Sequence, residues 1–127
     1  MEKRFFTIDE ARQALPVVRE LVGQAMALSE QLESYRGLVE KLAQSAQSNA
    51  GSPGGTTYVR LLMALQQCLG KIQEAGCLVK SVEDGLIDFP HLRGGREVYL
   101  CWKYGEDDIH FWHETDAGFA GRTPLLD

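Results

Sequence analysis

A regular seam of apolar residues in the first half of the chain constrains the fold more than any other feature. From Leu21 onward, apolar residues alternate at intervals of four and three positions, with mostly polar or charged residues between them. The seam consists of Leu21, Ala25, Leu28, Leu32, Tyr35, Val39, Leu42 and Ala46. This spacing is typical of an α-helix with one apolar stripe, which would lie in water if the helix stood alone. The pattern therefore requires a partner for the helix.

The start of this first helix is marked by a capping box at residues 7–10. The Thr7 hydroxyl can accept a hydrogen bond from the Glu10 amide while the Glu10 carboxylate accepts one from the Thr7 amide. The helix is therefore expected to begin at about Ile8. Pro16 lies inside the helical pattern and lacks an amide donor, which predicts a kink there.

A second apolar stripe follows a turn-rich loop at residues 48–56. The loop is composed mainly of glycine, serine, asparagine and proline, and it lacks the spacing of a phosphate-binding loop. The second stripe predicts a helix from about Thr57 to Ala75 and consists of Leu62, Leu65, Leu69 and Ile72. Two helices joined by a short polar loop are typical of an antiparallel hairpin.

After Gly76 the apolar pattern changes from a helical to a strand period. Three to four strands are expected, with candidates at residues 77–80, 86–89, 97–103 and 109–113. Pro90 is expected to end the second of them, because proline cannot donate a hydrogen bond within a sheet. The Gly-Gly pair between Arg93 and Arg96 predicts a tight hairpin turn.

These elements predict an α+β fold: a long antiparallel α-helical hairpin followed by a small antiparallel β-sheet of three to four strands. The 127 residues fit a single domain. The hairpin is expected over residues 7–76, with its loop at 48–56, and the sheet and a C-terminal loop over residues 77–127.

The distribution of charge bears on the kind of partner. Residues 1–83 hold nine acidic and nine basic residues, whereas residues 84–127 hold nine acidic and four basic ones. The chain therefore lacks the basic surface that nucleic-acid binding requires, and no nucleic-acid partner is expected. The acidic C-terminal part suits a cation better than a polyanion.

The cysteines and the apolar segments bear on location. Cys68, Cys77 and Cys101 form no Cys-x-x-Cys motif and cannot all pair, which favours a reducing cytoplasm and small buried side chains. The chain has no run of eighteen apolar residues and no secretory signal pattern at its start, so no membrane association is expected.

The stretch IHFWHETDAGFAGR, residues 109–122, concentrates the side chains that could carry chemistry. His113 lies near the end of an expected strand, and Asp116 follows in a sequence that favours a tight turn. A nitrogen from His113 and an oxygen from Asp116 could bind a divalent metal ion. Glu114, Asp88 or His91 could complete the ligand set.

Three other interpretations of these residues stay open. His113 could act as an acid or base oriented by Asp116, although no catalytic residue can be assigned and Cys101 is expected to pack. The group could be a structural clasp, in which Arg122 pairs with Asp88 or Asp116. Arginines beside the glycine-rich turns could instead bind a small anion, and these are Arg93, Arg96 and Arg122.

Three segments together resemble a known family. They are FTIDEARQALPVVREL near the start, VKSVEDGLIDFPHLRGGREVYLCWKYGE in the predicted sheet, and WHETDAGFAGRTPL near the end. The sequence resembles the bacterial family called domain of unknown function 2203 over nearly the whole chain. The resemblance implies a small cytoplasmic bacterial protein and supplies no activity, substrate or catalytic residue.

Two functions are consistent with the sequence. The first is an interaction or oligomerisation module without catalysis of its own, a homodimer through its helices with a further protein as partner. The alternative is a protein that binds a metal or a small anion around His113, Asp116 and Arg122. Whether the protein is an enzyme does not follow from these residues.

Overall fold

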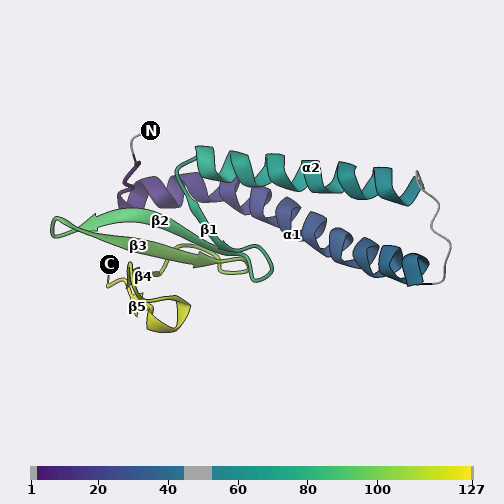
Figure 1. Cartoon of the computed structure of the whole chain (residues 1–127). Coiled ribbons are helices and arrows are strands. Elements are labelled where there is room, and N and C mark those ends of the chain that lie inside the picture. The colour runs from purple at the N-terminus through teal and green to yellow at the C-terminus, as the bar shows by residue number, and fades with distance from the viewer. Residues whose placement is uncertain (1–2, 45–52, 127) are drawn as a thin grey trace.

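The first half of the molecule is built from two long helices. The computed structural model describes residues 3–44 and 53–126. Helix α1 (Ile8–Gln44) and helix α2 (Pro53–Glu74) lie side by side and run in opposite directions (Figure 1). The expected start of α1 is confirmed, and so is the capping box. The Glu10 amide donates to the Thr7 hydroxyl at 3.0 Å, and the Thr7 amide donates to the Glu10 carboxylate at 2.8 Å.

Helix α2 begins four residues earlier than the apolar stripe predicts. Residues 53–56, expected in the loop, belong to the first turn of α2. A proline is well tolerated at the first position of a helix, where the backbone amide has no partner within the helix. The remainder of the expected loop, residues 48–52, lies outside the described residues, as does Ala46 of the apolar seam.

The second half forms one antiparallel sheet. Its strands are β1 (Leu78–Ser81), β2 (Leu86–Arg93), β3 (Arg96–Lys103), β4 (Phe111–Glu114) and β5 (Thr123–Pro124), side by side in that order. The α+β class is therefore confirmed. The sheet has five strands where three to four were expected, because Thr123 and Pro124 pair with β4.

Strand β2 continues through Pro90, contrary to the expectation that this residue ends it. Pro90 pairs with Tyr99 of β3, and its carbonyl accepts a hydrogen bond of 2.7 Å from the Phe6 amide. The pairing of β1 with β2 reaches Asp88 and does not extend to Pro90. The proline therefore lies where the N-terminal segment borders β2, and no β1 carbonyl there needs an amide from it.

The turn between β2 and β3 sets the register of the site. Gly94 and Gly95 both have positive φ, at 61° and 79°, and Arg93 pairs with Arg96 across the turn. Positive φ at both central residues is the geometry of the preferred two-residue hairpin turn, which glycine adopts without strain. The two-residue turn predicted from the Gly-Gly pair is confirmed.

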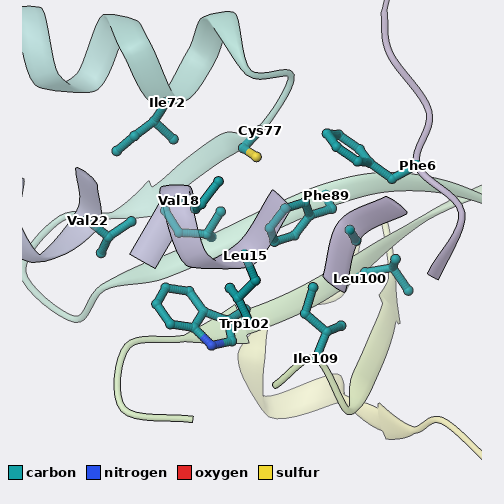
Figure 2. Close-up of a cluster of buried hydrophobic side chains, with 12 residues drawn as sticks. Phe6, Leu15, Val18, Val22, Ile72, Cys77, Phe89, Leu100, Trp102 and Ile109 are labelled. Atoms are coloured by element: carbon teal, nitrogen blue, oxygen red, sulfur yellow. The ribbon is translucent and has the colours of Figure 1, made fainter. Parts of the chain in front are cut away.

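The hydrophobic core lies between the helices and one face of the sheet. The sheet contributes fully buried side chains to it, namely Ile87, Phe89, Leu100 and Trp102. Figure 2 shows Leu15 and Val18 of α1 between Ile72 of α2 and the sheet residue Trp102. The opposite face of the sheet points away from the helices, toward the C-terminal segment (Figure 1).

In the described part of the chain, neither helix combines the length and the apolar character needed to cross a membrane.

Candidate metal centre

Three chemically active side chains meet on the face of the sheet that points away from the helices. Strand register pairs Asp88 with Cys101 across β2 and β3, and Tyr99 with His113 across β3 and β4. Side chains two residues apart on a strand share a face, so Asp88, Cys101 and His113 share this one. One potential ligand atom from each lies within 4.8 Å of the other two, and all three residues are buried.

The hydrogen bonds of His113 define how its ring is used. Its Nδ1 lies 2.7 Å from the Glu114 carbonyl oxygen, which can only accept, so Nδ1 carries a proton. Its Nε2 lies 3.1 Å from Oδ1 of Asp88. A neutral imidazole has one proton, so Nε2 then presents a lone pair to the carboxyl group. A proton or a metal ion between Nε2 and Asp88 would satisfy both atoms.

Burial makes the carboxylate and the thiolate of this group costly. Burial raises the pKa of Asp88, against the opposing attraction of His113 and of Lys80, whose Nζ lies 3.9 Å from Oδ2. Burial, together with the neighbouring Asp88 charge, raises the pKa of Cys101 to about 12. A divalent cation would stabilise both anionic forms at once.

The same geometry does not favour Cys101 as a nucleophile. Reactive cysteines have a depressed pKa and lie beside a base or a positive charge. Here the thiol lies close to Asp88, and burial together with the charge of that carboxylate raises the thiol pKa. The expectation that Cys101 packs in the interior is consistent with its burial, but its sulfur also belongs to the polar group.

A pocket of about 240 Å³ opens onto the three residues. Besides Asp88, Cys101 and His113, it is lined by Lys80, Leu86, Ala117, Gly118 and Phe119. Phe119 belongs to the short 3-10 helix η1 (Phe119–Gly121) of the C-terminal segment. The group therefore lies where a small molecule could reach it.

The structure places Asp116, the expected ligand partner of His113, outside this group. Asp116 is exposed, whereas Asp88 is 2% exposed and contacts the His113 ring directly. Glu114 offers its carbonyl to His113, but its carboxylate pairs with Arg96 at 2.7 Å. His91 binds the Phe6 carbonyl through Nδ1 at 2.7 Å and does not join the group.

The three arginines considered for anion binding have separate partners. Arg122 pairs with Glu106 at 2.6 Å, and not with Asp88 or Asp116, and its guanidinium lies over the rings of Phe111 and Phe119. Arg93 lies over Trp112, and Arg96 pairs with Glu114. The Arg122 contacts hold the segment after β4 against the sheet, whereas those of Arg93 and Arg96 join β2 and β3 to β4, so the three arginines do not form one site.

Cys101 and Lys80 are the members of the site that residue spacing alone did not assign. A signal for Cys101 was present, because a two-residue turn at Gly94-Gly95 also pairs Asp88 with Cys101, six residues from the turn on each strand. No comparable signal pointed to Lys80, whose position depends on the register of β1 and its irregularity between Val79 and Ser81.

The described residues define an α+β protein with a buried Asp–Cys–His group at the floor of a small pocket. The chain belongs to the family described as uncharacterized conserved protein (DUF2203), whose model matches residues 4–125. No curated protein and no solved structure matches the chain.

Proposed function

We propose that the protein binds a divalent transition-metal ion through Asp88, Cys101 and His113, and that zinc is the ion that fits best. The observation that carries the proposal is the convergence of a carboxylate oxygen, a sulfur and an imidazole nitrogen, all buried, within 4.8 Å of one another. Structural histidines and aspartates are common, but a buried cysteine in the same small group adds a ligand that zinc favours.

The separations between the three ligand atoms would suit a zinc ion after a small inward movement of the side chains. A tetrahedral zinc ion with bonds of roughly 2.0 to 2.3 Å holds its ligand atoms about 3.3 to 3.8 Å apart. The separations here reach no more than 4.8 Å, and Nε2 of His113 lies 3.1 Å from Oδ1 of Asp88. Side-chain rotations that move each ligand atom by about 1 Å or less would therefore place the three atoms around an ion.

The surroundings support the same assignment. A histidine that binds metal through one nitrogen usually donates its other N–H to a carbonyl or carboxylate, which orients the ring. The 2.7 Å contact from Nδ1 of His113 to the Glu114 carbonyl supplies that support and leaves Nε2 for the ion. Cys101 forms no disulfide bond and is therefore available as a ligand.

A zinc titration against a chromophoric chelator tests this proposal, with Cys101→Ser as the variant and Cys77→Ser as its matched control. Burial raises the pKa of Cys77 to about 12, as it does for Cys101, but Cys77 lies in the helix-facing core. We expect one zinc ion per untagged chain and retention of that ion by Cys77→Ser. Cys101→Ser should lose at least about 100-fold in affinity, since even residues that only support ligands contribute about 10- to 100-fold. Absence of stoichiometric zinc, or equal affinity in the two variants, would refute the metal site.

A second candidate function, self-association through the helices, is favoured by a different observation. Several large apolar side chains on α1 and α2 are exposed, namely Leu38, Val59, Leu62 and Met63. Two copies that pack these surfaces together would form a four-helix bundle and remove the side chains from water. The protein would then act as a homodimeric interaction module, whether or not a further protein binds to it.

Sedimentation equilibrium at micromolar concentration tests self-association. We expect a dimer for the natural sequence and a monomer for Leu62→Glu, with the helical circular dichroism signal unchanged. Leu92→Glu is the matched control, because Leu92 is also exposed but lies on β2, and it should remain dimeric. A natural sequence that remains monomeric would exclude this candidate.

A further inference from the structure

We infer that the metal keeps one coordination position open to the pocket, and that this position takes the carboxylate group of a small organic acid held also by Lys80. This inference rests on the proposed metal function and adds to it a class of ligand. It is carried by the ligand count, by the charge of the pocket and by the apolar part of its lining.

The ligand count leaves room for an exogenous group. Zinc in a closed structural site has four protein ligands, whereas a site with three keeps a position for water or substrate. Among residues 3–44 and 53–126, the group of potential ligand side chains contains three members and no fourth. All three line the pocket, so the open position of the ion faces the pocket and not the hydrophobic core.

The charges favour an anion at that position. The negative charges of Asp88 and of a Cys101 thiolate together offset a divalent ion, while His113 contributes a neutral nitrogen. Lys80 then adds an uncompensated positive charge at the pocket wall, with its Nζ 3.9 Å from Oδ2 of Asp88 and 4.7 Å from the centre of the Tyr99 ring. A loaded site therefore has a net positive charge, although the C-terminal part of the chain is acidic overall.

The size and lining of the pocket restrict what the anion is attached to. Its volume of about 240 Å³ lies below the roughly 300 to 1,000 Å³ that is usual for drug-sized ligands. Leu86, Ala117 and Phe119 supply an apolar wall beside the polar floor. A carboxylate with a short aliphatic chain would place its charge at the metal and Lys80 and its carbon atoms against this wall.

Lys80 supplies none of the three proposed ligand atoms, so its charge can be tested separately from them. Its side chain is about half exposed and its ammonium lies over the Tyr99 ring, so Lys80→Met removes the charge while keeping a long apolar stem near that ring. Lys80→Arg keeps the charge and serves as the matched control. The cobalt affinity of each variant is measured first, and the carboxylate titrations are made on protein saturated with cobalt.

The experiment uses the cobalt(II)-loaded protein, whose visible absorption reports the coordination of the ion. Acetate and butyrate are titrated at constant ionic strength, with sodium chloride as the reference salt. We expect both carboxylates to change the cobalt spectrum, with butyrate binding more tightly because it reaches the apolar wall. Lys80→Met should weaken binding by about tenfold, the effect of losing one charge-assisted contact. Lys80→Arg should retain most of the affinity.

The outcomes separate this inference from the metal site itself. If cobalt does not bind stoichiometrically, the metal site is refuted. If cobalt binds but the carboxylates leave its spectrum unchanged, the metal site stands and the carboxylate assignment is refuted. The same holds if the carboxylates bind Lys80→Met as tightly as they bind the natural protein.

Discussion

The two faces of the sheet are built from the same strands but differ in chemistry. Toward the helices, β2 and β3 present Ile87, Phe89, Leu100 and Trp102, all fully buried and apolar. Toward the C-terminal segment, the residues between them include Asp88 and Cys101, and β4 adds His113; these three are buried as well. Alternation along a strand makes this possible, because neighbouring residues point to opposite sides.

The difference indicates which face stabilises the fold and which one serves binding. Apolar burial on the helix-facing side is favourable, at about 1.5 to 3 kcal/mol for a large side chain. A buried carboxylate beside an imidazole is a poor source of stability, because removing charges from water costs about as much as their attraction returns. Residues of the first face should therefore determine the free energy of unfolding, and those of the second face should determine metal affinity.

The largest expected effect is on the helix-facing side. Trp102→Ala should lower the free energy of unfolding by about 3 to 5 kcal/mol, because it leaves a large cavity. It also leaves the Glu106 carbonyl without the 3.0 Å hydrogen bond that the indole donates. Urea denaturation followed by circular dichroism measures the loss, and Trp102→Phe should lose clearly less. A change below 1 kcal/mol would show that this face does not stabilise the fold as described.

At alkaline pH, the free energy of unfolding should depend on one buried thiol from each face of the sheet. Burial raises the pKa of Cys77 and of Cys101 from 9.0 to about 12. A raised pKa keeps the thiol protonated in the folded protein, so its contribution is complete below pH 9 and is lost as the pH rises toward 12. Each thiol should lower the free energy of unfolding by about 1 kcal/mol from pH 9 to pH 10, because the unfolded thiol is already half ionised at pH 9.

Denaturation at the two pH values, in the metal-free protein, measures this slope. Cys77→Ser and Cys101→Ser should each reduce this slope, while Cys68, whose pKa burial also raises, contributes in every variant. With zinc bound, Cys101 is already a thiolate and its part should disappear, while that of Cys77 persists. An unchanged slope in both variants would contradict the raised pKa values.

A smaller effect is expected from the helix cap, which lies far along the chain from the pocket residues. Thr7→Ala removes the hydroxyl that accepts from the Glu10 amide and should destabilise the protein by about 1 kcal/mol. Thermal unfolding measures the loss, with Thr7→Ser as the control that keeps the cap. Zinc affinity should be the same in all three proteins. A lower zinc affinity of Thr7→Ala would show that the helix cap and the metal site are coupled.

Much of the fold was predictable because its signals are local. The capping box fixes the start of α1, and the Gly-Gly pair fixes the turn between β2 and β3. The errors arise where contacts with residues distant along the chain determine the extent of a strand. Pro90 remains in a strand because the N-terminal segment borders β2 there, and Thr123–Pro124 becomes a strand because β4 offers it an edge.

The candidate site was predicted in part, since His113 and Asp88 were both singled out. The sequence favours Asp116 as the partner of His113 because the two are close along the chain, whereas Asp88 is brought to His113 across two strand pairings. Counting outward from the predicted turn would have paired Asp88 with Cys101. The positions of Arg122 and Lys80 depend on the path of the C-terminal segment and on the irregular register of β1, and no local pattern encodes these.

Asp88→Asn tests most directly the claim that the polar face serves binding and not stability. In the metal-free protein, the asparagine amide can donate to Nε2 of His113, which the carboxylate cannot do, and the cost of a buried charge disappears. We predict that the free energy of unfolding stays within about 1 kcal/mol of the natural value or rises, while zinc affinity falls at least tenfold. The two quantities are measured on the same preparation by urea denaturation and chelator competition. A loss of about 3 to 5 kcal/mol with no change in zinc binding would identify Asp88 and His113 as a structural pair and contradict this account.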